Sequence, residues 1–314
     1  MTTILVTGAT GNVGREVVAR LAAAGVSVRT LVRDARRAPE GVDAVEGDLA
    51  VPATLEPALA GVEAVFLIWP FLTAEGAPPV LDVLERHIRR VVYLSSSGVN
   101  AAGVNAAGVN AAGVNAAGVN ASGVNAAGVN ASGVGSASGR QTDPINQLHA
   151  DMERLITGSG MEWTVLRADT IASNTRGWAA QIRDAGVVRG PEIAPTAVVD
   201  PRDVAAVAAL VLAGGGHMGR TYVLTGPEVI GRADQVRAIG EAVGRPLRFE
   251  KVPVEEARAR MLADGRPPAL VEALLSAAGT RARSGVVTTT VEQLTGEPAR
   301  TFARWAADHA ADFR

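Results

Sequence analysis

The sequence of 314 residues contains no cysteine, one lysine and two tyrosines, and each scarcity excludes a class of chemistry. Without cysteine there is no disulfide framework, thiol nucleophile or cysteine–zinc site, and we expect no bound metal. A mechanism that requires lysine must use Lys251, and one that requires tyrosine must use Tyr93 or Tyr222. No apolar run approaches the ~20 residues of a transmembrane helix, so we expect a soluble, cytoplasmic protein that does not enter a membrane.

An excess of charge of one sign is also missing. Thirty basic residues stand against 32 acidic ones, which leaves a net charge of −2. This balance does not produce the basic field of a nucleic-acid-binding protein, and we expect no direct binding of nucleic acid. The hydrophobic fraction of 47% is sufficient for a large core. The length favours one large α/β domain, or a core with a smaller lobe.

A glycine-rich turn follows the first predicted strand. Residues 4–7 form a short apolar run that stops at Gly8, and a helical stripe of apolar residues begins at residue 13. In this context Gly8 permits the tight turn, Gly11 lets the backbone approach a pyrophosphate, and Gly14 lets helix and strand pack closely. The phosphates would face the N–H groups at the helix N-terminus. The sequence therefore predicts a dinucleotide site that consists of Gly8, Thr10, Gly11, Asn12, Val13 and Gly14.

The residues after the second predicted strand, at 26–32, bear on which dinucleotide binds. Arg33 comes first, and a guanidinium suits the 2′-phosphate of NADP. Asp34 follows, and a carboxylate suits the free ribose hydroxyls of NAD. We favour NADP(H) with Arg33 as its ligand, and NAD(H) remains the alternative.

Strands and helices continue to alternate along the chain. Strands are predicted at 43–46, 64–68, 90–94 and 164–166, and helices at 52–59, 80–88 and 143–157. This alternation predicts a Rossmann-like, doubly wound parallel sheet, whose ligands bind beyond the carboxyl ends of the strands. Further cofactor contacts are therefore expected from Asp48, Leu49, Ile68, Trp69, Ser95, Ser96 and Arg167. For Arg167 an ion pair with a neighbouring loop carboxylate is the alternative.

Several motifs together resemble one family. They are Thr7-Gly-Ala-Thr-Gly-Asn-Val-Gly14, Val92-Tyr-Leu-Ser-Ser-Ser97, Trp163-Thr-Val-Leu-Arg167, Asn174 and Tyr222-Val-Leu-Thr-Gly-Pro227. In this order they resemble the NmrA-like, NAD(P)H-binding branch of the atypical short-chain dehydrogenases/reductases, over nearly the whole chain. The resemblance implies a Rossmann core in residues 1–170, with residues 171–314 completing the core and forming a small, mostly helical substrate lobe. Members of the branch are reductases, or redox sensors that bind the nucleotide without turnover.

The chain departs from the wider superfamily in its proton donor. Neither tyrosine has a lysine four residues further on, so the Tyr-x-x-x-Lys pair is absent. On the predicted helix at 143–157, His149 takes the place of the tyrosine and Glu153 that of the lysine. A histidine, with a pKa near ~6.5, can donate a proton, and Ser97 is a second candidate catalytic residue. A packing histidine paired with Glu153 is the alternative.

These observations leave two functions open. One is an NADPH-dependent reductase that transfers hydride directly to a quinone-like or other conjugated electrophile. The other is a non-catalytic NAD(P)-binding redox sensor. For the enzyme we expect a small-molecule substrate and a monomer or homodimer.

The C-terminal part is predicted to contain helices at 200–213, 232–243, 254–263, 289–294 and 299–311, and a strand at 221–224. Asp200 followed by Pro201 is a strong helix start. Asn174 and Trp178 are candidate substrate contacts. Packing within the lobe is the alternative for both residues.

A tandem repeat interrupts the core at residues 98–139. The unit Gly-Val-Asn-Ala-Ala or Gly-Val-Asn-Ala-Ser occurs seven times. A period of five residues places no continuous apolar stripe on a helix or on a strand. We expect a flexible low-complexity loop, with a stacked pentapeptide-type coil as the alternative, and no contribution to nucleotide binding.

Overall fold

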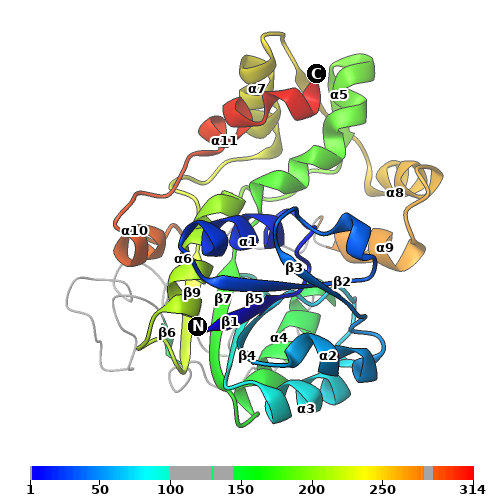
Figure 1. The fold of residues 1–314 in the computed structure, drawn as a ribbon. Helices are drawn as coiled ribbons and strands as arrows, with labels where there is room; N and C mark the ends of the chain where they lie inside the picture. The colour runs from blue at the N-terminus through cyan, green and yellow to red at the C-terminus, as the bar shows by residue number, and fades with distance from the viewer. Residues whose placement is uncertain (1, 100–128, 131–143, 277, 279–285) are drawn as a thin grey trace.

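The computed structural model describes residues 2–99, 129–130, 144–276, 278 and 286–314, and its centre is one large sheet (Figure 1). The strands lie in the order β3-β2-β1-β4-β5-β7-β9-β6, and all neighbours are parallel except β6 and β9. Their bounds are β1 Thr3–Val6, β2 Ser27–Val32, β3 Asp43–Glu46, β4 Val62–Leu67, β5 Arg90–Ser96, β6 Val129–Asn130, β7 Glu162–Ala168 and β9 Arg220–Leu224.

The strand order contains a reversal next to β1. From β1 the chain builds β2 and β3 on one side, then returns to β4 on the other side and continues to β5, β7 and β9. The carboxyl ends of parallel strands share one edge of the sheet, and ligands of such sheets bind beyond that edge where the order reverses. The reversal lies between β1 and β4. The glycine-rich turn follows β1 in the sequence, so it lies at this point of the sheet edge.

Helices cover both faces of the sheet. Figure 1 shows α1 (Gly14–Ala23) and α6 (Pro201–Ala213) on one face, and α2 (Glu56–Leu59), α3 (Ala77–His87) and α4 (Pro144–Thr157) on the other. The two apolar clusters that join these layers explain why the central strands are buried on both faces. Helix α6 begins as expected from the sequence, because the Asp200 side chain accepts a hydrogen bond from the backbone N–H of Arg202.

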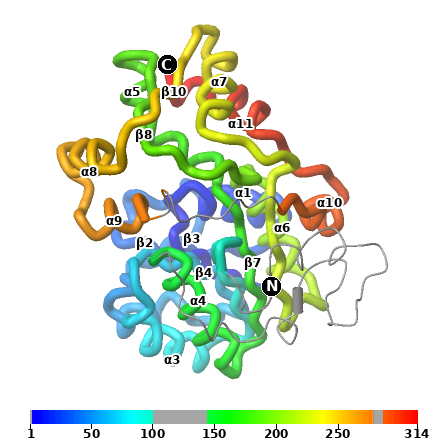
Figure 2. The backbone as a smooth tube through the Cα atoms, turned by 180° about the vertical axis from the view of Figure 1, so that it is seen from behind, coloured from blue at the N-terminus to red at the C-terminus, as the bar shows by residue number. Residues whose placement is uncertain are grey.

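The C-terminal lobe lies above the core and is mostly helical (Figure 2). Its own core cluster includes Ile182, Val236, Ile239, Phe302, Trp305 and Phe313. The lobe elements are α5 (Ala179–Ala185), α7 (Arg232–Val243), α8 (Val254–Ala263), α9 (Pro268–Ser276), α11 (Phe302–Asp308), and the parallel strands β8 (Val187–Gly190) and β10 (Arg248–Lys251). Helix α9 also contacts α4 of the core, and α10 (Thr290–Thr295) packs on α6.

The structure confirms the predicted fold class, and its differences from the predicted elements are local. The region 52–59 divides into the 3-10 helix η2 (Pro52–Leu55) and α2, and the predicted helix at 299–311 divides into α11 and η4 (Ala310–Phe313). Sequence analysis missed η3 (Ala172–Trp178), α5, β8, α9 and β10. Strand β10 is mostly exposed and has no apolar run, so its sequence lacks the pattern of a strand. Apart from residues 98–99 and 129–130, the tandem repeat lies outside the described residues.

Candidate functional site

The glycine-rich turn connects β1 to α1 and leaves little or no space for side chains at its glycines. Gly8 has a φ of 63°, which disfavours other residues. A Cβ on Gly14 would lie 2.1 Å from the carbonyl oxygen of Gly8, and one on Gly11 would lie 3.1 Å from the same atom. Within the described residues no side chain caps the N-terminus of α1, where Val13 is the N-cap residue. The turn therefore presents uncapped N–H groups beside an open backbone, which fits the pyrophosphate of a dinucleotide.

Two side chains hold the turn in place. Arg15 donates from Nη2 to the carbonyl oxygen of Thr10 at 3.0 Å and from Nε to that of Gly11 at 3.3 Å. On the other side, the backbone N–H of Ile68 donates to Thr7 Oγ1 at 2.7 Å, and Thr7 Oγ1 donates to the Ile68 carbonyl oxygen at 3.0 Å. These bonds tie the ends of β1 and β4 together, so Ile68 lies beside the turn as predicted.

The segment after β2 presents arginines to solvent. Arg33 is exposed, as are Arg36 and Arg37 in the 3-10 helix η1 (Ala35–Arg37). Asp34 is engaged locally: it accepts from the side chain of Arg36 at two distances of 2.9 Å and from the backbone N–H of Arg36 at 3.0 Å. The hydrogen bonds from Arg36 lower the pKa of the Asp34 carboxyl. The negative charge of Asp34 is thus already paired with the guanidinium of Arg36.

The predicted residues after β3 and β4 are buried or half-buried. Leu49 and Trp69 belong to the apolar cluster under α2 and α3, and Trp69 donates from Nε1 to the Thr73 carbonyl oxygen at 2.9 Å. Asp48 is half-buried, and its Oδ1 accepts from the backbone N–H of Ala50 at 2.9 Å. The sheet places all three residues after the carboxyl ends of their strands, where the sequence predicted them.

The serines at the end of β5 have different partners. Ser95 is buried and donates to Glu153 Oε1 at 2.5 Å, whereas Ser96 donates to Asn146 Oδ1 at 3.0 Å. Ser97 is half-buried, its backbone N–H donates to the Ala168 carbonyl oxygen at 2.9 Å, and its hydroxyl has no partner within the described ranges. Ser97 is therefore the serine whose side chain remains available to a ligand.

His149 lies on α4 and pairs with a tyrosine of β5. Its Nδ1 is 2.7 Å from Tyr93 Oη. Tyr93 is fully buried, and burial together with the nearby Glu153 carboxylate raises its pKa well above its usual value. The hydroxyl thus keeps its proton. Sequence analysis missed this role of Tyr93, although a tyrosine in an otherwise apolar strand requires a hydrogen-bond partner.

Glu153, one turn further along α4, forms a buried ion pair. Arg167 donates from Nε to Glu153 Oε1 at 2.9 Å and from Nη2 to Oε2 at 2.6 Å. The two side chains are only 8% and 10% exposed. The structure thus places Arg167 in the ion pair that was the alternative to a cofactor contact, although its partner is on a helix. The pair joins α4 to β7 and, through Ser95, to β5.

The two candidate substrate residues lie on η3. Asn174 is exposed, and Trp178 is half-buried against the apolar cluster of the lobe. The contacts of Trp178 favour packing within the lobe. The exposure of Asn174 leaves its side chain accessible to a ligand.

Comparison with known proteins assigns the family. An NAD(P)H-binding family model matches residues 8–214, which include the glycine-rich turn, the Tyr93–His149 pair and α6. The chain belongs to this NAD(P)H-binding family. The match confirms NAD(P)H as the cofactor predicted from the turn, and it confirms the resemblance found in the sequence.

Curated relatives of this family member extend over its whole length. The (4-alkanoyl-5-oxo-2,5-dihydrofuran-3-yl)methyl phosphate reductase of Streptomyces griseus is 41% identical over 318 residues, which cover 99% of each chain. The NAD(P)H azoreductase of Xenophilus azovorans is 33% identical, again over 99% of each chain. Both are reductases, and the predicted class, an NAD(P)H-dependent oxidoreductase, is confirmed.

A solved structure shares the fold. The NADPH-dependent quinone oxidoreductase of Escherichia coli, solved in complex with NADPH, superimposes with a TM-score of 0.73 at 20% identity, over 97% of this chain and 99% of that one. Within the described residues, no helix is long and apolar enough to cross a membrane.

Proposed function

We propose that the protein is an NADPH-preferring reductase of conjugated, electron-poor small molecules, with His149 as the proton donor. The hydrogen bond between Tyr93 Oη and His149 Nδ1 carries this proposal, because it supplies a positioned acid where the Tyr-x-x-x-Lys pair is missing. When bound, the reduced nicotinamide supplies the hydride. The chain itself must then provide a proton and hold the acceptor.

The substrate class is supported by the two curated relatives. The name of one describes a dihydrofuranone whose ring double bond is conjugated with two carbonyl groups, and that of the other describes an azo compound. Both are electron-poor π systems that take up a hydride at one atom and a proton at another. An acceptor of this kind does not need a strongly activated tyrosine, because the charge that develops is delocalised.

Tyr93 positions the ring of His149. The buried tyrosine hydroxyl has no second partner within the described residues, so its hydrogen bond to Nδ1 is the contact that satisfies it. The raised pKa of Tyr93 keeps the hydroxyl protonated over the physiological pH range, so the hydroxyl can donate to Nδ1 of the neutral ring or accept from Nδ1–H of the protonated ring. A neutral imidazole is too weak an acid to protonate the acceptor. The acid is therefore the protonated form of His149, which gives up the proton on Nε2 and keeps the one on Nδ1.

The preference for NADPH is supported by charge at the end of β2. Arg33 is exposed and has no ion-pair partner among the described residues, whereas Asp34 is already bound by Arg36. A 2′-phosphate thus meets available guanidinium groups, and a ribose hydroxyl meets a carboxylate that is already occupied. An Arg33→Ala change should weaken NADPH by roughly 1.5–3 kcal/mol and leave NADH unchanged. The exposed Arg237 on α7 provides the control, Arg237→Ala.

Steady-state kinetics test the proposal. NADPH oxidation is measured with a panel of quinones, azo dyes and conjugated enones, together with titrations of NADPH and NADH. We expect turnover with at least one class and tighter binding of NADPH. Tight nucleotide binding without oxidation by any acceptor would instead support the non-catalytic sensor.

A further inference from the structure

Arg176, at the end of η3, joins the glycine-rich turn to the C-terminal end of the chain. Its Nη1 donates to Asn12 Oδ1 at 2.9 Å, and its Nε donates to Asp312 Oδ2 at 2.7 Å. Asn12 is the residue between Gly11 and the N-cap of α1. The guanidinium of Arg176 therefore lies beside the part of the turn where the uncapped N–H groups are.

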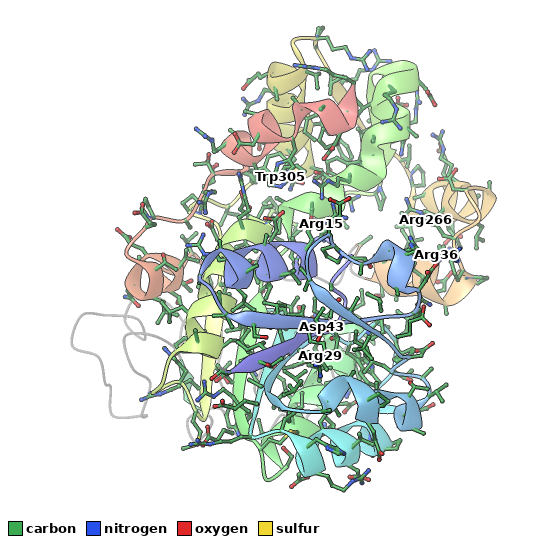
Figure 3. All side chains as sticks on the ribbon, viewed as in Figure 1. Arg15, Arg29, Arg36, Asp43, Arg266 and Trp305 are labelled. Carbon is green, nitrogen blue, oxygen red and sulfur yellow. The ribbon has the colours of Figure 1, made fainter. Side chains whose placement is uncertain are left out.

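The lobe fixes the orientation of this guanidinium. Its central carbon lies 5.8 Å from the centre of the Trp305 ring, a cation–π distance. Trp305 is fully buried and stacks on His309 with ring centres 4.8 Å apart, so it is a rigid platform. Figure 3 shows Trp305 in the lobe and Arg15 at the start of α1 below it, the two sides that Arg176 connects. Arg183 also contacts Asp312, because it donates to the Asp312 carbonyl oxygen at 3.1 Å.

Arg176 has hydrogen-bonding capacity that these contacts do not use. A guanidinium carries further N–H groups beyond the two donors that bind Asn12 and Asp312, and those have no partner within the described part of the chain. The side chain is 28% exposed, so these groups are not sealed in the core. Arg15, the other arginine at the turn, already donates to two turn carbonyls and so serves to hold the backbone.

We propose that Arg176 binds the pyrophosphate of NAD(P)H from the lobe side. The partial positive charge of a helix N-terminus, roughly half an elementary charge, compensates only part of a pyrophosphate. A forked guanidinium held beside the turn supplies further N–H donors for the phosphate oxygens, and Asp312, which accepts from its Nε, holds it in that orientation. The inference rests on the nucleotide binding of the proposed function and not on its chemistry or substrate.

The test compares nucleotide affinity in neutral variants of Arg176. In Arg176→Met, calorimetric titration should show weaker binding of NADPH and NADH, by the same factor of about ten or more, because both contain the pyrophosphate. Adenosine 2′-monophosphate, which lacks it, should bind the variant as it binds the wild type. Arg183→Met is the matched control, since Arg183 contacts the same Asp312 but not the turn, and it should bind both nucleotides like the wild type.

A purely structural role predicts a different result. If Arg176 only fastens the lobe to the core, Arg176→Met lowers the unfolding midpoint and leaves both dissociation constants unchanged, and that outcome overturns the proposal. If Arg176→Met does not fold, Arg176→Gln takes its place, because glutamine keeps an N–H donor but removes the charge. The test measures nucleotide binding and does not depend on turnover. A protein that binds nucleotide but reduces no acceptor would refute the proposed reductase activity, and the role of Arg176 in binding could still be tested.

Discussion

Gly14 is the residue at which the turn tolerates least change. Its missing Cβ would lie 2.1 Å from the Gly8 carbonyl oxygen, a backbone atom that cannot move without opening the turn. We expect Gly14→Ala to destabilise the protein by about 1–3 kcal/mol and to abolish NAD(P)H binding. Thermal unfolding and nucleotide titration measure the two effects. Gly215→Ala is the control, because a Cβ there meets open space, and a Gly14→Ala protein that still binds NADPH normally would contradict the assigned site.

The two tyrosines of the chain provide an internal comparison. Tyr93 and Tyr222 both pair with a histidine, at 2.7 Å to His149 and 2.8 Å to His217, but only the pair between β5 and α4 belongs to the proposed site. We expect Tyr93→Phe to lower kcat and leave the NADPH dissociation constant unchanged, because the ring of His149 loses the hydrogen bond that positions it. Tyr222→Phe should leave kcat unchanged. If Tyr93→Phe and Tyr222→Phe lower kcat by the same factor, the loss comes from a general effect on stability and not from the position of Tyr93 beside His149.

Whether the contact of a single residue can be predicted from the sequence depends on how close its partner is along the chain. The glycine-rich turn and the Asp200 cap are contained within a few residues, and both could be predicted. The partner of Tyr93 depends on how α4 lies against β5, which the sequence does not show. Arg176 contacts Asn12 and Asp312, 164 and 136 residues away, and no local pattern marks such a bridge.

At the scale of elements, the buried ion pair between Glu153 and Arg167 fastens α4 to β7. Removing one partner leaves the other charge buried, so Glu153→Gln should lower the free energy of unfolding by about 3–5 kcal/mol in urea titrations. Replacing both residues, as Glu153→Leu with Arg167→Met, should recover much of the loss.

An exposed pair of the same shape is the control for this prediction. Arg258 also binds Glu272 through Nε and Nη2, but Glu272 on α9 is 59% exposed. Glu272→Gln should therefore have a much smaller effect. A Glu153→Gln protein as stable as the Glu272→Gln protein would show that the buried pair does not hold α4 in place.

The elements of the core were easier to predict than those of the lobe. In a parallel sheet a typical strand is an apolar run followed by a turn and a helix. This local pattern made β1 to β5 and β7 predictable from the sequence. In the lobe, β10 is a mostly exposed strand that pairs with β8 in a two-stranded sheet, and η3 follows β7 without an apolar stripe. Their conformations are determined by contacts within the lobe core, which no short window of sequence contains.

At the scale of the whole molecule, we expect that the tandem repeat at residues 98–139 is not required for folding or for nucleotide binding. Residues 98–139 contain no charged or aromatic side chain that could bind phosphate or stack on a base. Deleting residues 101–137 removes the two-residue edge strand β6 and shortens the connection between β5 and α4. The free energy of unfolding should change by no more than about 1–3 kcal/mol, because loop-closure entropy depends only logarithmically on length. The NADPH dissociation constant should stay the same. A deletion variant that does not fold would show instead that the repeat is a structural part of the domain.

The central claim, that this family member passes a hydride from NADPH to a conjugated acceptor and a proton from His149, is tested most directly by isotope transfer. NADPH with deuterium at the transferable nicotinamide position is mixed with the best conjugated enone of the panel, because an enone takes up the hydride at carbon and the C–D bond does not exchange with water. The product is analysed by mass spectrometry. The account predicts one deuterium in the product of the wild type, and the same labelled product formed more slowly by His149→Gln. Oxidation of NADPH without deuterium in the product, or tight binding with no oxidation of NADPH at all, would contradict it.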